Sequence, residues 1–202
     1  MNPKDFLILL IVSFLWGGSF LFIRLLVLEG MEPLEIVSMR MLLASIFILP
    51  FLLNRSKKHS FKDHSLSFLL IGILNTALPF TLFAYASLQL GAGSLSVLQA
   101  TVPILTALIL FSLFKNEFSI SKLIGVLIGF VGLYVLVGPG SNFDLFSSIL
   151  CVIASLSYSV AGVYLARTPN KLNNTYIGMG SIIIGAIIPV SYTHLTLPTI
   201  NW

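Results

Sequence analysis

Residues 6–28 read FLILLIVSFLWGGSFLFIRLLVL, and this stretch decides the class of the protein. A helix needs about 20 mostly apolar residues to cross the hydrocarbon core of a bilayer, and Phe6–Leu28 meets that need. Comparable apolar runs follow at Leu34–Leu53, Ser65–Leu88, Ser94–Phe114, Ile120–Val137 and Leu145–Ala166, and a seventh begins near Tyr176. Since the gaps between runs are short, the sequence predicts an all-α, polytopic transmembrane bundle of antiparallel neighbours.

The composition excludes an ordinary soluble domain. Apolar residues make up 57% of the chain and charged residues 9%, whereas soluble domains carry about 25% charged residues. The net charge of +4 could suggest a nucleic-acid partner. However, the basic residues sit in short gaps between apolar runs and do not interleave with aromatic residues on a polar face. We therefore expect the lipid bilayer, and no nucleic acid, as a partner.

The basic residues also predict an orientation. Lys4 precedes the first run, and further Lys or Arg residues fall in the gaps 54–64, 115–119 and 167–175. The alternate gaps, EGMEP, QLGAG and GPGSNFD, hold neither residue. Because cytoplasmic loops are enriched in Lys and Arg, we expect the N-terminus and the basic loops in the cytoplasm. We also expect a multi-pass protein of the plasma membrane of a bacterium.

Signatures of enzymes and metal sites are absent from the sequence. There is no P-loop, no HExxH motif and no pair of carboxylates within an apolar run. The single cysteine, Cys151, lies inside an apolar run without metal-ligand spacing. The sequence therefore predicts neither an enzyme nor a cofactor or metal.

Small residues predict where helices approach closely. Residues 125–132 read GVLIGFVG, and the spacing of Gly125 and Gly129 is one that lets two helix backbones meet in a membrane. We expect close helix packing at these glycines.

Two stretches carry a resemblance to a known family. The first is FLWGGSFLFIR in the first run, and the second is AYASLQLGAGSLSVLQATVPILTALILFSLFKNEFSISKLIGVLIGFVGLYVLV, residues 84–137. In order and spacing they resemble the EamA-type repeat of the drug/metabolite transporter (DMT) superfamily. The matching residues are Trp16-Gly17, Arg40, Pro103 and Glu117, followed by the glycine-rich helix. The arginine that usually follows the loop glutamate is missing here, which leaves its role in doubt.

The resemblance implies a fold of ten helices in two inverted five-helix repeats. Residues 6–137 would form the first repeat and 145–189 the start of the second, with Ser157-Tyr158-Ser159 placed where Trp16-Gly17 stands in the first. The implied function is secondary transport, and in particular export, of small metabolites or of amino-acid-like or drug-like compounds by alternating access around a midplane cavity. The alternative is a non-transporting membrane fragment or scaffold that lacks its second repeat. A homodimer that rebuilds both repeats is also left open.

Polar residues inside the apolar runs are the candidate substrate-binding residues. A charge within a membrane helix is costly and by default functional, so Arg40 comes first. Its alternative role is to snorkel to the surface and pair with Glu29, Glu32 or Glu35. Asn75 beside Pro79 and Gln99 beside Pro103 place amides at helix breaks, and their alternative role is hydrogen bonding between helices. The full set is Trp16, Ser19, Arg40, Asn75, Tyr85, Gln99 and Tyr158.

The last residues differ in character from the rest. The end of the chain, VSYTHLTLPTINW, is polar, rich in threonine and interrupted by Pro198 where a seventh helix should cross the membrane. Its first ten residues match the translation of an adaptor used in transposon-based sequencing libraries. We interpret residues 190–202 as a non-native tail; the alternative is a genuine loop and C-terminus.

Overall fold

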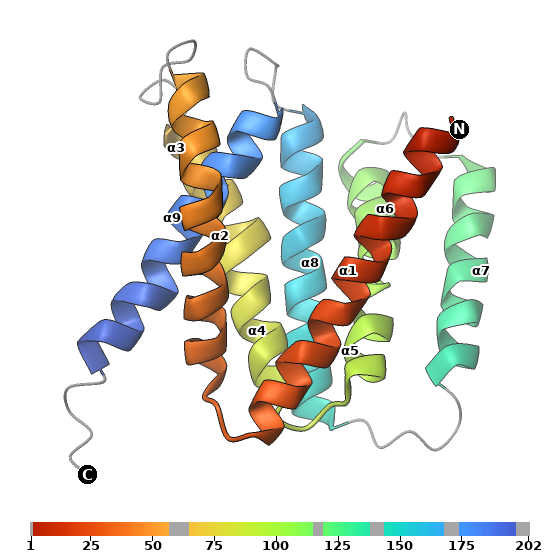
Figure 1. The fold of residues 1–202 in the computed structure, drawn as a ribbon. Coiled ribbons are helices and arrows are strands. Elements are labelled where there is room, and N and C mark those ends of the chain that lie inside the picture. Colours follow the sequence, from red (N-terminus) through yellow and green to blue (C-terminus); the bar gives the residue numbers. More distant parts are fainter. Residues whose placement is uncertain (1, 57–64, 115–118, 138–143, 168–173, 197–202) are drawn as a thin grey trace.

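The predicted all-α bundle is confirmed by a computed structural model (Figure 1), which describes residues 2–56, 65–114, 119–137, 144–167 and 174–196. Each apolar run is helical, and no strand occurs in these parts of the chain. The helices are α1 Pro3–Leu28, α2 Pro33–Ser56, α3 Ser65–Gly72, the π-helix Ile73–Ala77, α4 Leu78–Ala86, α5 Ala92–Gln99, α6 Val102–Leu113, α7 Ile120–Val137, α8 Leu145–Arg167 and α9 Asn174–Thr196.

Within the described ranges, five helical segments are long and apolar enough to cross a membrane, namely Pro3–Leu28, Pro33–Leu53, Ser65–Ala86, Ala92–Leu113 and Leu145–Arg167. Two of these segments are interrupted: Ser65–Ala86 contains the π-helix, and Ala92–Leu113 is divided into α5 and α6. α7 and α9 contribute shorter apolar stretches, Ile120–Gly129 and Tyr176–Ser191. The chain is therefore a multi-pass membrane protein.

Local chemistry explains where two of the helices begin. Gly30 turns the chain between α1 and α2 with a φ of 91°, a conformation that a side chain would disfavour. Asp144 precedes α8 and accepts a hydrogen bond from the backbone amide of Ser147 at 2.7 Å, as an N-cap does. Hydrogen bonds from the side chain and the backbone of Ser147 lower the pKa of the Asp144 carboxyl, because they stabilise its charged form.

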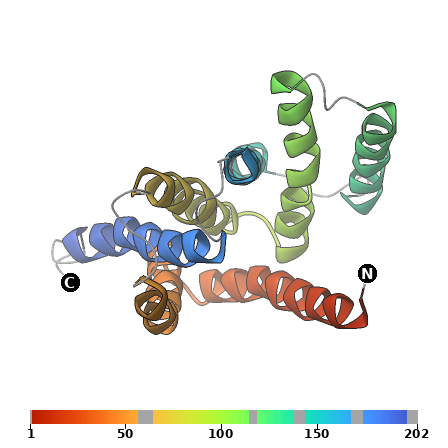
Figure 2. The ribbon, with the colours of Figure 1, turned by 90° about the horizontal axis from the view of Figure 1, so that it is seen from above.

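The helix α8 stands at the centre of the bundle (Figure 2). It packs against α4 on one side and α6 on the other, while α9 packs against α2 and α3. α1 runs along one flank in contact with α5, and α7 is the outermost helix on the side of α6. A central helix that contacts both interrupted spans is placed to hold them together.

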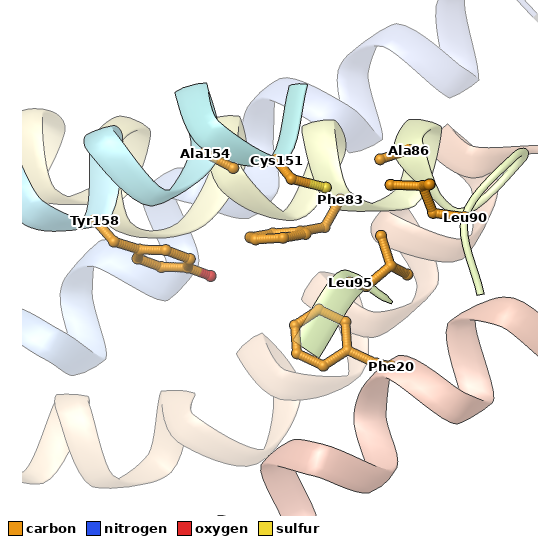
Figure 3. Close-up of a cluster of buried hydrophobic side chains, with 8 residues drawn as sticks. All are labelled: Phe20, Phe83, Ala86, Leu90, Leu95, Cys151, Ala154 and Tyr158. Atoms are coloured by element: carbon orange, nitrogen blue, oxygen red, sulfur yellow. The ribbon is translucent and has the colours of Figure 1, made fainter. Parts of the chain in front are cut away.

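The interior and the outer face of the bundle are both apolar. One buried cluster gathers side chains from α1, α4, α5, α8 and the turn after α4 (Figure 3), namely Phe20, Phe83, Ala86, Leu90, Leu95, Cys151, Ala154 and Tyr158. On the outside, large side chains such as Phe14 (81% exposed), Phe47 (73%) and Val135 (70%) are uncovered. Such an outer face suits hydrocarbon, since a soluble monomer rarely exposes large apolar patches.

Two glycines of α9 pack tightly against α3. A Cβ built on Gly185 would lie 2.8 Å from the carbonyl oxygen of Gly72, and one on Gly180 would lie 2.5 Å from the ring of Phe68. The prediction of a close approach at Gly125 and Gly129 is wrong. A Cβ on Gly125 would meet no described atom within 4 Å, and one on Gly129 would only touch the side chain of Ile104 at 3.7 Å.

The space beside those glycines is a cavity of about 570 Å³ between α7 and the α5–α6 segment. The glycines of α7 line it together with Pro103 and small or apolar side chains of α6. The glycine face of α7 does point towards α6, but the cavity separates the two helices, so their backbones do not meet there.

Parts of two predictions fall outside the described residues. Most of the gaps 54–64, 115–119 and 167–175 lie there, as do residues 197–202. The helix α9 continues through Pro189 to Thr196, further than the apolar run alone suggested. The interpretation of residues 190–202 as non-native stays a prediction.

Candidate functional site

A cavity of about 240 Å³ opens halfway along α1, between α1, α2, α4 and α8; we call it the Arg40 cavity. Residues one helical turn apart on α1 form one wall, because positions three or four apart share a helix face. The lining residues are Val12, Leu15, Trp16, Ser19, Phe20, Ile23, Arg40, Phe80, Phe83 and Tyr158. The cavity is thus mostly aromatic and aliphatic, with a few polar groups.

Arg40 supplies the charge of this cavity. It lies on α2 about two turns from the start of the helix, and its Nη2 donates a hydrogen bond to Ser19 Oγ at 2.8 Å. The guanidinium carbon lies 5.1 Å from the centre of the Phe80 ring, within the range of a cation–π contact. The alternative partners named above, Glu29, Glu32 and Glu35, do not pair with it: the structure gives Arg40 the hydroxyl of Ser19 instead.

A second, more open cavity of about 750 Å³ adjoins the first; we call it the Gln99 groove. The two share Val12, Trp16, Phe20 and Tyr158. The indole Nε1 of Trp16 donates a hydrogen bond to Gln99 Oε1 at 3.1 Å. The lining adds Ser13, Gly17, Asn75, Ser96, Gln99, Ala100, Val102 and Pro103, so this side contributes two amides and two hydroxyls.

The π-helix beside the groove leaves one carbonyl without its helical partner. The amide of Leu78 donates to the carbonyl of Ile73, five residues back, and Pro79 has no N–H for the carbonyl of Leu74. Ser157 Oγ of α8 donates to that carbonyl at 2.7 Å. A hydroxyl of the central helix therefore stabilises the irregular backbone next to Asn75.

Serines of α8 also donate to the backbone at the break between α5 and α6. Pro103 cannot continue the hydrogen-bond pattern of α5, and the backbone amide of Thr101 donates instead to the carbonyl of Leu98 at 3.2 Å. Ser155 Oγ donates to the same carbonyl at 3.2 Å, and Ser159 Oγ lies 3.0 Å from the carbonyl of Val102. Irregular backbone within a membrane protein is tolerated where such partners or a cavity satisfy it.

The structure brings most of the predicted site residues together. Six of the seven line the Arg40 cavity or the Gln99 groove, namely Trp16, Ser19, Arg40, Asn75, Gln99 and Tyr158. Tyr85 lines neither and is 38% exposed. It follows the cavity-lining Phe83 by two positions, which on a helix is about 200° around the axis.

Some lining residues gave no signal in the sequence. Phe20, Phe80 and Phe83 form the aromatic wall, and Phe20 meets Phe83 edge to face at 5.3 Å between ring centres. Apolar residues within an apolar run do not stand out in the sequence. The available signal was that Phe80 and Phe83 are three positions apart, on one helix face, and directly follow the helix break at Pro79. Arg24 also has no predicted role; its Nη1 donates to the carbonyls of Ser87 and Leu88, where α4 ends.

Known proteins resemble most of this chain. An uncharacterized transporter of Archaeoglobus fulgidus is 26% identical over 97% of this chain and 69% of its own length. The uncharacterized transporter YoaV of Bacillus subtilis is 21% identical over 95% of this chain and 68% of its own. The uncharacterized inner membrane transporter YedA of Escherichia coli is 32% identical over 76% of this chain and 50% of its own length.

These names describe transporters, and the chain spans about two thirds of the first two relatives and half of YedA. No solved structure matches the chain significantly. Residues 4–138 match the EamA-like transporter family, a stretch that nearly coincides with the predicted first repeat. The chain is a membrane transporter protein that belongs to the EamA-like transporter family.

Proposed function

We propose that this protein is a secondary transporter that exports small metabolites, amino-acid-like or drug-like compounds, by alternating access around the Arg40 cavity. The observation that carries the proposal is the place of Arg40: a half-buried charge within a membrane-length helix, held by Ser19 in a cavity midway along α1. Charges inside membrane helices mark substrate or ion paths. The volume of about 240 Å³ suits a ligand somewhat smaller than those of drug-sized pockets, which occupy about 300–1,000 Å³.

The relation between α1 and α8 supports an inverted-repeat mechanism. α1 and α8 run in opposite directions (Figure 1), as the first helices of two inverted repeats would. Trp16 of α1 and Tyr158 of α8, which correspond in the predicted repeats, both border the cavity and the groove. A site between two such helices would open to either side as one repeat rocks against the other.

Counterflow in proteoliposomes tests the proposal. The full chain is reconstituted in liposomes loaded with a panel of metabolites and dyes, and the exchange of labelled substrate is measured. We expect Arg40→Lys to lower the flux roughly tenfold or more, because lysine cannot reproduce the geometry of a guanidinium and one charged hydrogen bond contributes about 1.5–3 kcal/mol. Yield and helix content should stay unchanged. Absence of flux across the whole panel, from protein with normal helix content, would favour a membrane protein that does not transport.

We further propose that the protein lies in the plasma membrane of a bacterium with its N-terminus in the cytoplasm. The start of α1, the start of α7 and the end of α8 lie at one end of the bundle (Figure 1), and these segments carry Lys4, Lys122 and Arg167. The opposite end carries Glu29, Glu32 and Asp144. This asymmetry supports an inside position for the basic end, and the name of YedA, an inner membrane transporter, agrees.

Cysteine labelling measures this orientation. Cys151 is the single native cysteine and is fully buried, so a Cys151→Ala chain is a suitable background. Lys4 is exposed at the basic end of the bundle, and Glu29 is exposed at the opposite end. A membrane-impermeant maleimide should label Glu29→Cys in intact cells and Lys4→Cys only after permeabilisation. The reverse pattern would place the N-terminus outside.

A further inference from the structure

The Arg40 cavity holds a positive charge without a matching negative one. A guanidinium has five N–H donors, and the hydrogen bond that Arg40 makes is to Ser19 Oγ. Among the described residues, no acidic side chain lines the cavity or the Gln99 groove, and no carboxylate pairs with Arg40. Because an uncompensated charge at this depth is costly, the cavity favours a ligand that brings an anion.

A second polar group faces the same space. The ring of Tyr158 lies 6.4 Å from the ring centres of both Phe80 and Phe83, and its hydroxyl points away from α8 (Figure 3). No residue that the structure describes exchanges a hydrogen bond with this hydroxyl. A phenol beside a guanidinium can donate to an anion that the guanidinium binds, so Tyr158 and Arg40 form a pair of donors.

The side chains around these two donors determine which apolar body and which further charge the ligand can have. Phe20, Phe80, Phe83 and Trp16 surround the space, and aromatic rings prefer to stack on or meet other flat rings edge to face. An ammonium group would find no described carboxylate in either cavity, and Arg40 would repel it. The lining therefore disfavours a zwitterion relative to a simple acid with the same body.

We propose that the Arg40 cavity binds organic carboxylates that have a flat apolar body and no ammonium group. The carboxylate accepts hydrogen bonds from Arg40 and from the Tyr158 hydroxyl, and the body packs against Phe20, Phe80 and Phe83. This inference rests on the proposed function and narrows it: of the compounds named there, it selects acids without an ammonium group over amino-acid-like ones.

Binding of matched probes to the full chain tests this class. Trp16 lines the cavity, and Trp202 is the second of the chain's two tryptophans, so Trp202→Phe leaves Trp16 as the reporter of binding. The chain is placed in nanodiscs of zwitterionic lipid and titrated with 3-phenylpropanoate, with its neutral amide and with phenylalanine. We expect the acid to bind roughly tenfold more tightly than either of the others, as a charged hydrogen bond implies.

Variants connect this preference to the two donors. Arg40→Gln should abolish the preference for the acid, and Arg40→Lys, which keeps the charge, should restore part of it. Tyr158→Phe should weaken binding of the acid by roughly fivefold while leaving binding of the amide unchanged. Arg40→Lys and Tyr158→Phe keep the test decisive if Arg40→Gln does not fold.

Three other results of these titrations would contradict the proposal, each in a different part. Equal affinity for acid and amide would overturn the carboxylate class while leaving the cavity as a binding site. Binding of none of the probes would overturn the carboxylate class, whereas flux in the counterflow panel decides the proposed function separately. If nanodiscs with anionic lipid abolish binding of the acid, the anion on Arg40 is a lipid headgroup and the soluble acid is not its ligand.

Discussion

Replacing Gly185 with alanine should destabilise the protein by about 1–3 kcal/mol, the usual cost of overpacking a core. The new methyl group would lie 2.8 Å from the carbonyl oxygen of Gly72 and 2.8 Å from the Cβ and Cγ2 atoms of Thr76. Both neighbours belong to the interrupted span Ser65–Ala86, and a backbone carbonyl cannot rotate away as a flexible side chain would. The helix α9 must therefore move outward from α3 and lose buried contacts.

The same helix offers a matched control. A Cβ on Gly178 would meet no described atom within 4 Å, so Gly178→Ala adds the same methyl group without a clash. Alanine also raises helix propensity by about 1 kcal/mol over glycine, which should make the control neutral or stabilising. The temperature at which the detergent-solubilised protein aggregates compares the two variants. Equal temperatures would mean that α3 and α9 are not in contact at Gly185.

Replacing Ser157 with alanine should cost a similar amount, about 1–3 kcal/mol, because it leaves a buried carbonyl without a partner. That carbonyl belongs to Leu74, which the π-turn and Pro79 deprive of an amide donor. Ser157 is 5% exposed, so bulk water does not replace the lost hydroxyl. The loss should loosen the backbone next to Asn75 and change the groove as well as the stability.

A second serine on α8 serves as the comparison. The hydroxyl of Ser148 donates to the carbonyl of Asp144 at 2.8 Å, an exposed hydrogen bond within the first turn of the helix. Ser148→Ala should therefore change the midpoint of thermal unfolding little, whereas Ser157→Ala should lower it clearly. Amide hydrogen exchange should also speed up in residues 73–78 of Ser157→Ala alone. Unchanged exchange there would show that Ser157 does not hold the π-turn.

The sequence alone indicates the positions of both helix breaks. Pro79 and Pro103 lie inside apolar runs, beside Asn75 and Gln99, and proline removes a donor wherever it stands in a helix. The sequence could not show that the first break is a π-turn or that serines of α8 donate to the backbone at both breaks. Those partners are separated by 57 and 83 positions along the chain, and their meeting depends on how α8 packs.

The sequence indicated some residues of the candidate site, and only the structure showed the others. Polar residues stand out because they are rare in apolar runs, and six of the seven predicted residues border one of two adjoining cavities. From the sequence, Arg40 could contact either a ligand or the surface glutamates. In the structure, its guanidinium donates a hydrogen bond to Ser19. The aromatic wall of Phe20, Phe80 and Phe83 gave no signal, because an apolar side chain looks the same whether it faces lipid or a cavity.

By itself the sequence determined the all-α membrane class and the approximate positions of the apolar spans, because a bilayer requires apolar runs of sufficient length with all backbone hydrogen bonds made internally. Only the tertiary structure decided which faces of those helices meet. Gly185 is crowded against Gly72, while Gly125 stands beside an open cavity, although both are glycines in apolar helices. The physical reason is that rotation and tilt about each helix axis follow from packing against all neighbours at once, and no local spacing of residues contains that information.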